Sequence, residues 1–150
     1  MYKARCGNSK SRGFTLIEMM IALAVVAILA AIALPSFQES VIKARRSDGL
    51  DALLYVQQLQ EKYRANHTDF GTLIEIGYAA AAPALSSDGY YTVTTTGEGS
   101  GTAYTVTAAA VAGKSQVSDT SNPVNCTTLT LTVTATNPRG VKAPAQCWTN

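Results

Sequence analysis

The feature that most constrains this chain is an uninterrupted apolar segment near its N-terminus. Residues 14–34 contain a single ionisable side chain, Glu18, and Pro35 follows them directly. As a helix, a segment of this length extends about 30 Å, which is the thickness of the hydrocarbon core of a bilayer. The residues before it carry four Lys and Arg and no acid. This charge pattern predicts a single-pass protein whose N-terminus stays cytoplasmic and whose remainder lies across the membrane.

The order of features within residues 1–34 distinguishes two kinds of targeting segment. A secretory signal peptide also has a basic start and an apolar stretch, and its cleavage site follows small residues such as those near Ala33. In this chain, Gly13 and Phe14 instead stand between the basic residues and the apolar stretch, and Glu18 follows within it. This order argues against a secretory signal peptide, which stays open as the alternative.

The sequence Gly-Phe-Thr-Leu-Ile-Glu at residues 13–18 resembles the class III leader of the type IV pilin (prepilin) family. The resemblance implies that a prepilin peptidase cuts between Gly13 and Phe14 and that Phe14 becomes N-methylated. It implies that Glu18 pairs with the N-terminal amine of a neighbouring subunit during assembly. The partners it implies are other pilin subunits, the peptidase, the pilus assembly platform and the inner membrane.

The position of Glu18 also has a physical interpretation beside the role that the resemblance implies. A carboxylate in hydrocarbon costs about 2–3 kcal/mol near the centre of a helix and less toward its end. Glu18 lies about one turn from the end that cleavage would create, where the helix terminus and a free amine both favour an anion. The alternative is that Glu18 only extends to the membrane interface.

These features divide the chain into a cleaved leader at 1–13, a transmembrane or filament-core helix at 14–35, and a globular periplasmic or extracellular domain at 36–150. Pro35 lacks an amide hydrogen and is expected to kink the helix or to start a new one. Many pilins carry Gly where this chain has Ala27, so Pro35 would have to be the main weak point of the helix in a filament.

The next segment, Ser36 to about Asn66, reads as an amphipathic helix. One face is apolar and is expected to pack on a sheet, and polar residues fill the other faces. Lys43, Arg45 and Arg46 form a basic patch there, which we expect to face solvent or another subunit. The apolar face consists of Val41, Ala44, Leu50, Ala52, Leu53, Leu54, Val56, Leu59 and Tyr63.

The rest of the chain predicts a connecting loop followed by strands. Residues 67–88 lose periodicity and are expected to form a loop with a short turn of helix at most. Residues 90–96, 104–111 and 127–134 alternate apolar residues with Thr, which predicts antiparallel strands with one buried face. Residues 137–140 read as a turn. The fold class is therefore α+β, with a long N-terminal helix packed on a small antiparallel sheet.

Cys126 and Cys147 remain after the leader, with its Cys6, is removed. An even pair on the oxidising side of a membrane predicts a disulfide, which would close the C-terminal region. Two free thiols or a metal site are the alternatives, and the second lacks ligands because His67 is the only histidine. The stretch that begins at Cys126, the Arg139-Gly140 turn and the final Cys-Trp resemble the minor pilins of the PilE type more than the major pilins. Trp148 is expected to pack on the core.

Charge and motifs argue against several function classes. Without the four leader cations, eight Lys and Arg stand against ten Asp and Glu, so bulk charge gives no support for nucleic-acid binding, although a nucleic-acid partner remains possible. No phosphate-binding glycine loop, nucleophile–base pair or metal-ligand cluster is evident, so we expect a protein that is not an enzyme and has no cofactor. Asp88 and Asp119 lie in no dense acidic loop of the kind that binds calcium.

The sequence therefore predicts a structural subunit, a minor one, of a type IV pilus that serves adhesion, twitching motility or DNA uptake. It would reside in the bacterial inner membrane before assembly and in the extracellular pilus afterwards. Two alternatives stay open. One is a pseudopilin of a type II secretion system, and the other is a tip pilin that binds DNA or a surface.

Overall fold

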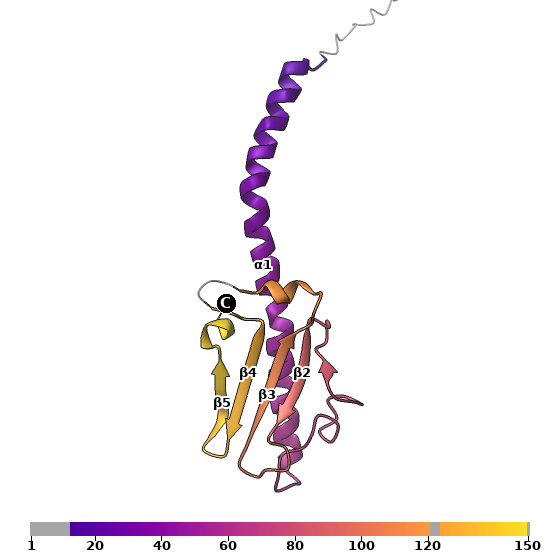
Figure 1. Ribbon diagram of the computed structural model, residues 1–150, viewed down its shortest axis with the longest axis vertical. Helices are drawn as coiled ribbons and strands as arrows, with labels where there is room; N and C mark the ends of the chain where they lie inside the picture. Colours follow the sequence, from indigo (N-terminus) through magenta and orange to yellow (C-terminus); the bar gives the residue numbers. More distant parts are fainter. Residues whose placement is uncertain (1–12, 121–123, 150) are drawn as a thin grey trace, which may run out of the picture. The chain divides into compact units, whose positions relative to one another are not determined.

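The computed structural model describes residues 13–120 and 124–149. Two compact units divide the chain, the first ending at Gln38 and the second beginning at Glu39. Figure 1 shows the elements in chain order. They are α1 (Leu16–Arg64), β1 (Ala84–Leu85), β2 (Tyr91–Thr96), β3 (Ala103–Ala110), the 3-10 helix η1 (Ser115–Ser118), β4 (Thr128–Thr134), β5 (Asn137–Ala143) and the 3-10 helix η2 (Ala145–Trp148).

Helix α1 is continuous from Leu16 to Arg64, with Pro35 inside it. Pro35 therefore does not start a new helix, and whether it kinks α1 stays a prediction. The N-terminal part of α1 is long and apolar enough to cross a membrane, and its large apolar side chains are exposed. The C-terminal part belongs to the second unit and carries the buried residues of the helix.

The five strands form one antiparallel sheet in the order β1-β2-β3-β4-β5, so that each strand pairs with its neighbour in sequence. The register places Val93 opposite Ala108 on the next strand and Val106 opposite Leu131. The three predicted strands are confirmed to within about a residue at either end. Residues 97–102, which include Gly97, Gly99 and Gly101, connect β2 to β3.

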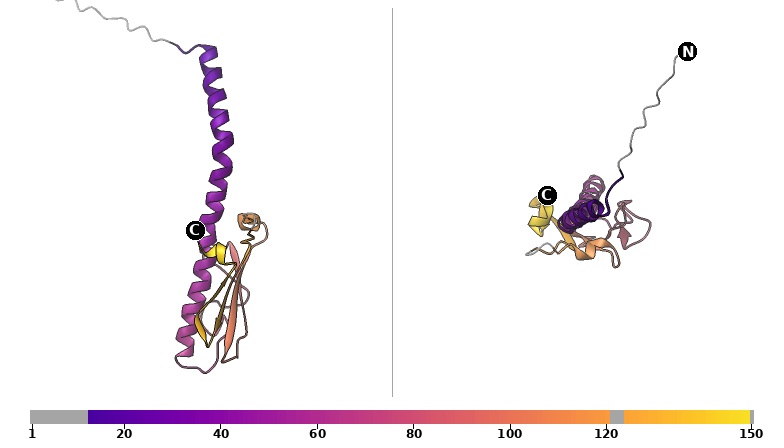
Figure 2. Two further views of the ribbon diagram at one scale, coloured as in Figure 1. Left: turned by 90° about the vertical axis from the view of Figure 1, so that its left-hand side faces the viewer. Right: turned by 90° about the horizontal axis from the view of Figure 1, so that it is seen from above.

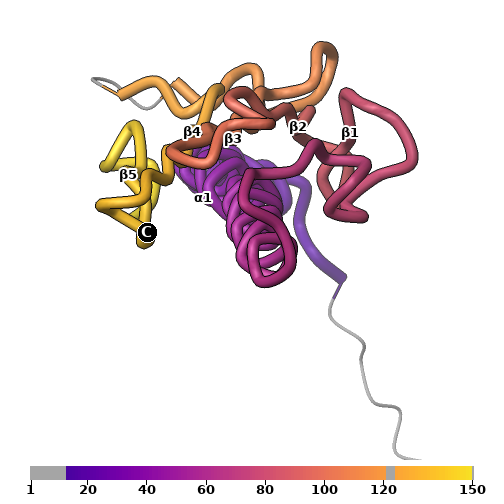
Figure 3. Tube along the Cα trace, turned by 90° about the horizontal axis from the view of Figure 1, so that it is seen from below, coloured from indigo at the N-terminus to yellow at the C-terminus, as the bar shows by residue number. Residues whose placement is uncertain are grey.

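The core lies between the C-terminal part of α1 and one face of the sheet (Figures 2 and 3). Leu53 and Val56 of α1 are fully buried, and so are Val93, Val106 and Leu131 of the sheet. The threonines that alternate with these residues are exposed or half-buried on the opposite face. The predicted α+β fold, with one helix packed on an antiparallel sheet, is confirmed.

Some polar residues of α1 are buried rather than exposed. Arg46, Asp48 and Gln60 are all buried. Each has its partners: Arg46 pairs with an aspartate, Asp48 accepts hydrogen bonds from Ser86 and two backbone amides, and Gln60 forms two hydrogen bonds with the Gly71 backbone. Burial of such groups is tolerated because they are hydrogen-bonded, which a helical periodicity cannot reveal.

The segment 137–143 is a strand, so the predicted turn at residues 137–140 is wrong. Gly140 has φ of +74°, and the pairing of β4 with β5 shifts register between Thr132 and Thr134, which marks a bulge or irregularity. Pro138 fits there because β5 is an edge strand, which needs no hydrogen bonds on its outer side. A second difference is β1, which lies in the segment predicted to be a loop.

Candidate functional site

Gly13, Phe14 and Thr15 precede α1, and the start of the helix is capped. The amide of Glu18 donates to Thr15 Oγ1 at 3.3 Å, and the amide of Thr15 donates to Glu18 Oε2 at 3.5 Å. This reciprocal pair is a capping box, in which two otherwise unpaired amides of the first turn are satisfied. Gly13 and Phe14 precede the helix and are exposed.

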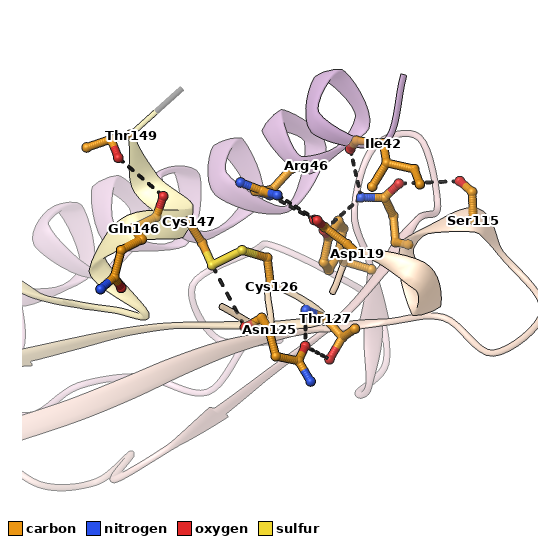
Figure 4. Close-up of polar contacts among 12 residues, drawn as sticks. Ile42, Arg46, Ser115, Asp119, Asn125, Cys126, Thr127, Gln146, Cys147 and Thr149 are labelled. Carbon is orange, nitrogen blue, oxygen red and sulfur yellow. Dashed lines mark hydrogen bonds and ion pairs between the residues drawn. A yellow bond between two sulfur atoms is a disulfide. The ribbon is translucent and has the colours of Figure 1, made fainter. Parts of the chain in front are cut away.

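The predicted disulfide is confirmed: Cys126 and Cys147 are joined, with their Cα atoms 5.7 Å apart (Figure 4). Both cysteines are buried. The bond links the segment before β4 to η2, so it closes the C-terminal region that contains β5. In the same region Trp148 packs against the core, as expected, and Lys142 Nζ lies 4.9 Å from the centre of its ring.

The segment between β3 and β4 is fixed to α1 by polar contacts (Figure 4). Arg46 Nε donates to Asp119 Oδ2 at 2.8 Å and Arg46 Nη2 to Asp119 Oδ1 at 2.6 Å. This hydrogen-bonded carboxylate raises the pKa of Arg46. Gln116 Nε2 donates to the Ile42 carbonyl at 3.1 Å and to the Tyr91 hydroxyl at 3.0 Å.

These contacts correct one expectation from the sequence. Arg46 does not belong to a solvated basic patch, because its guanidinium is buried against Asp119. The ion pair also occupies the Asp119 carboxylate, one of two that we had considered for calcium. In residues 13–120 and 124–149 there is no group of three or more His, Cys, Asp or Glu that could hold a metal ion.

Arg45, the neighbour of Arg46, takes part in a different cluster. Its guanidinium carbon lies 4.9 Å from the centre of the Tyr90 ring, and Lys114 Nζ lies 5.9 Å from the same ring centre. Arg45 Nη1 also donates to Ser115 Oγ at 2.8 Å. We call Arg45, Tyr90, Lys114 and Ser115 the Tyr90 cluster. It brings two cations from distant parts of the sequence to one aromatic ring.

Sequence reasoning missed the Tyr90 cluster and the Arg46–Asp119 pair. The residues come from α1, the position just before β2 and the segment after β3, and no local spacing connects them. His67, in contrast, lies exposed at the end of α1 and stacks on Tyr63, as a surface residue would.

Two family profiles match the chain. The profile described as "Type IV minor pilin ComP, DNA uptake sequence receptor" matches residues 35–130, which is more than half of the chain. The profile of the prokaryotic N-terminal methylation motif matches residues 8–34. The two matches together extend from residue 8 into β4.

Curated relatives are also pilins. The type IV major pilin protein PilA of Myxococcus xanthus is 40% identical over 75 residues, which cover 48% of this chain and 33% of that protein. A type IV major pilin protein PilE of Neisseria gonorrhoeae is 40% identical over 60 residues, covering 40% of this chain and 36% of that protein. A fimbrial protein of Neisseria meningitidis serogroup B is 38% identical over 63 residues, or 42% of this chain and 37% of that protein. These matches span about a third of the length of the relatives.

The relatives named PilE are major pilins, so the description as a minor pilin comes from the ComP profile rather than from them. The profile match, the methylation motif and the fold of one long helix on an antiparallel sheet agree with one another. This chain belongs to the type IV pilin family, among the ComP minor pilins.

Proposed function

We propose that this protein is a minor subunit of a type IV pilus that takes part in DNA uptake. The observation that carries the proposal is the match of residues 35–130 to a minor pilin family whose description names a receptor for DNA uptake sequences. The methylation motif at residues 8–34 supports the processing that a pilus subunit undergoes. Adhesion and twitching motility are functions that the same kind of filament would serve.

Processing by a prepilin peptidase would cut between Gly13 and Phe14 and methylate the new terminus at Phe14. The exposure of both residues and their place before the first helical turn support this step. The mature chain would then begin two residues before α1. Its new amine would lie within the first turn from Glu18, which already accepts a hydrogen bond there.

Assembly would transfer the apolar part of α1 from the inner membrane into the filament core. The large apolar side chains from Phe14 to Phe37 are exposed in the single chain, so they need either lipid or other helices around them. Pairing of Glu18 with the amine of a neighbouring subunit would set the register between subunits. Contacts of this head-to-tail kind do not close, so they build a filament on the assembly platform.

DNA binding by this chain would have to depend on local clusters of cations, because its net charge does not favour binding to DNA. The mature chain has more acids than cations, so attraction to DNA depends on where the cations gather. Three sites place cations on aromatic rings: the Tyr90 cluster, the pair of Lys142 and Trp148, and the pair of Arg64 and Phe70. All three belong to the second unit, which the ComP profile largely covers.

Mass spectrometry of sheared surface filaments and of the membrane fraction tests the pilus role. We expect a chain that begins with N-methyl-Phe14 in the filaments, at a small ratio to the main pilin. A processed chain confined to membranes would instead indicate a pseudopilin. A chain with a different N-terminus would contradict the processing step.

Uptake of labelled DNA by cells that lack this protein tests the second part of the proposal. We expect piliated cells whose DNA uptake is lost and is restored by the wild-type chain. Normal uptake in the deletion strain would contradict a role in DNA uptake and leave a structural pilus subunit.

A further inference from the structure

We propose that the Tyr90 cluster is a phosphate-contact site for DNA, in which Arg45 and Lys114 each neutralise a backbone phosphate without reading the base sequence. This inference rests on the proposed function, because it names the place where a DNA-uptake pilin would contact the phosphate backbone.

The cluster gathers positive charge that no carboxylate neutralises by direct contact. Both cations lie within 6 Å of the centre of the Tyr90 ring. In the described part of the chain, the only ion pair is the one between Arg46 and Asp119. Asp48, one turn along α1 from Arg45, is buried and directs its oxygens to Ser86 and to backbone amides. Two like charges held close together attract an anion.

The cations also keep donors free for a ligand. A guanidinium has five N–H groups, and the described contacts of Arg45 use one of them, on Ser115. The ammonium of Lys114 has three N–H groups and faces the ring at 5.9 Å, with no side-chain hydrogen bond in the described residues. Lys114 is exposed, and Arg45 is half-buried. Charge-assisted hydrogen bonds to phosphate oxygens are the strong interactions that such donors form.

The protein holds the cluster in place before any ligand arrives. The Val111 amide donates to the Tyr90 carbonyl at 2.9 Å, and the Lys114 amide donates to the Val111 carbonyl at 3.1 Å. Gln116 ties the same segment to the Ile42 carbonyl of α1. Because these bonds fix the backbone beneath both cations, little ordering is left to be done when a phosphate binds.

The geometry favours contact with phosphates over contact with bases. Arg45 and Lys114 already lie against the Tyr90 ring, so the ring serves as their support and is not a free stacking surface for a base. Contacts to phosphates position a protein on DNA but carry no sequence information. The cluster should therefore strengthen binding to all DNA sequences alike. The other two sites offer only one cation per ring, Lys142 on Trp148 and Arg64 on Phe70.

The test measures how DNA affinity depends on salt. The full chain in a non-ionic detergent is titrated with short double-stranded DNA of two unrelated sequences, by fluorescence anisotropy, at several salt concentrations. For the double variant Arg45→Gln and Lys114→Gln we expect the slope of log affinity against log salt to fall by about 1.8, since each lost phosphate contact removes about 0.9. The decrease should be equal for both DNA sequences.

A matched control removes the same charge elsewhere. Lys62→Gln with Arg139→Gln also eliminates two exposed cations, neither of which contacts an aromatic ring in the described residues. In this control the slope should change by less than about 0.9, which is half of the change expected for the Arg45 and Lys114 double variant. Lys114→Gln alone, which disturbs no side-chain hydrogen bond, should lower the slope by about 0.9 and excludes misfolding as the cause.

Three results overturn the inference. The first is an unchanged salt slope for DNA binding in the double variant. If the same double variant no longer binds phosphatidylglycerol vesicles, the cluster contacts lipid phosphates rather than DNA, which overturns the inference as well. The second is an equal decrease in the control. The third is a wild-type chain that binds neither of the two DNA duplexes. This third result also contradicts direct DNA binding under the proposed function, whereas the first two results leave that function intact.

Discussion

Arg46 and Asp119 form a buried ion pair with two hydrogen bonds, 2.8 and 2.6 Å long, between α1 and the segment that precedes β4. The two side chains are 5% and 0% exposed. The carbonyl of Asp119 accepts a hydrogen bond from the amide of Cys126 at 2.8 Å. A single aspartate thus connects the helix to the disulfide-closed region, and this connection holds together the part of the molecule that carries the Tyr90 cluster.

Removing one partner of this pair is expected to destabilise the protein strongly. Arg46→Leu leaves the Asp119 carboxylate buried without its cation, which costs about 3–5 kcal/mol. The double variant Arg46→Leu with Asp119→Leu removes both charges and should be more stable than the single variant. Urea denaturation of the chain in detergent, followed by circular dichroism, measures both. Equal stability of the single variant and the wild type would contradict the importance of the pair.

Replacing Tyr104 by phenylalanine is expected to stabilise the folded protein. Its side chain is 1% exposed, and its hydroxyl has no hydrogen-bond partner among the described residues. A buried donor without a partner costs about 1–3 kcal/mol, so Tyr104→Phe should raise the free energy of unfolding by about 1 kcal/mol. A substitution that lowers it would show that the hydroxyl has a partner, such as an ordered water.

The same substitution should change the response to alkaline pH. Burial raises the pKa of Tyr104 above its ordinary value of 10.0, so the folded protein keeps the phenol neutral where the unfolded chain ionises it. The free energy of unfolding is therefore not reduced by this phenol below pH 10, and it falls as the pH rises from there toward the folded-state pKa. Tyr104→Phe should show a smaller loss of unfolding free energy between pH 9 and 11. Some loss should remain, since burial also raises the pKa of Tyr91.

Opening the Cys126–Cys147 bond should destabilise the second unit. The two cysteines are 21 residues apart in sequence, and closing a loop of this length stabilises a protein by about 3 kcal/mol in the chain-entropy model. The double variant Cys126→Ser with Cys147→Ser should lower the midpoint of urea denaturation accordingly. Reduction of the wild type should have the same effect, and the double variant should not respond to reductant.

Gly140 should tolerate no side chain. An added Cβ would lie 2.6 Å from Leu131 Cδ1, and the backbone has φ of +74°. Gly140→Ala should therefore cost about 2–4 kcal/mol through the clash and the strained backbone together. Gly99→Ala is the control, because Gly99 has φ of +72° but nothing within 4 Å of an added Cβ. The control should cost only about 1 kcal/mol.

Glu18→Ala should block entry into filaments while leaving cleavage largely intact. The carboxylate would no longer meet the amine of a neighbouring subunit, whereas the bond after Gly13 would stay accessible. Thr15→Val is the control, since it removes the hydroxyl that caps the helix and keeps the carboxylate. Immunoblots of sheared filaments and membranes give both readouts. Normal incorporation of Glu18→Ala would contradict the pairing, and loss of both variants would indicate that capping is the essential role.

Local patterns were sufficient for the elements that repeat regularly. Alternation of apolar residues and threonines placed β2, β3 and β4, and two cysteines in the chain after the leader predicted their disulfide. The same approach failed for β5, where Pro138 and Gly140 resemble turn residues. An edge strand with an irregular register accommodates both, and that depends on the neighbouring strand rather than on the local sequence.

What the sequence determined by itself is what a one-dimensional pattern can encode. The apolar segment, its single acid and the motif that starts at Gly13 identified a membrane-anchored pilin, because length, hydrophobicity and order are properties of the chain alone. The tertiary structure alone decided which polar residues are buried and which partner each cation contacts. Arg45 and Arg46 are adjacent in sequence, yet Arg46 is buried on Asp119 and Arg45 lies against Tyr90. Their partners are more than forty residues away, and only folding brings such groups together.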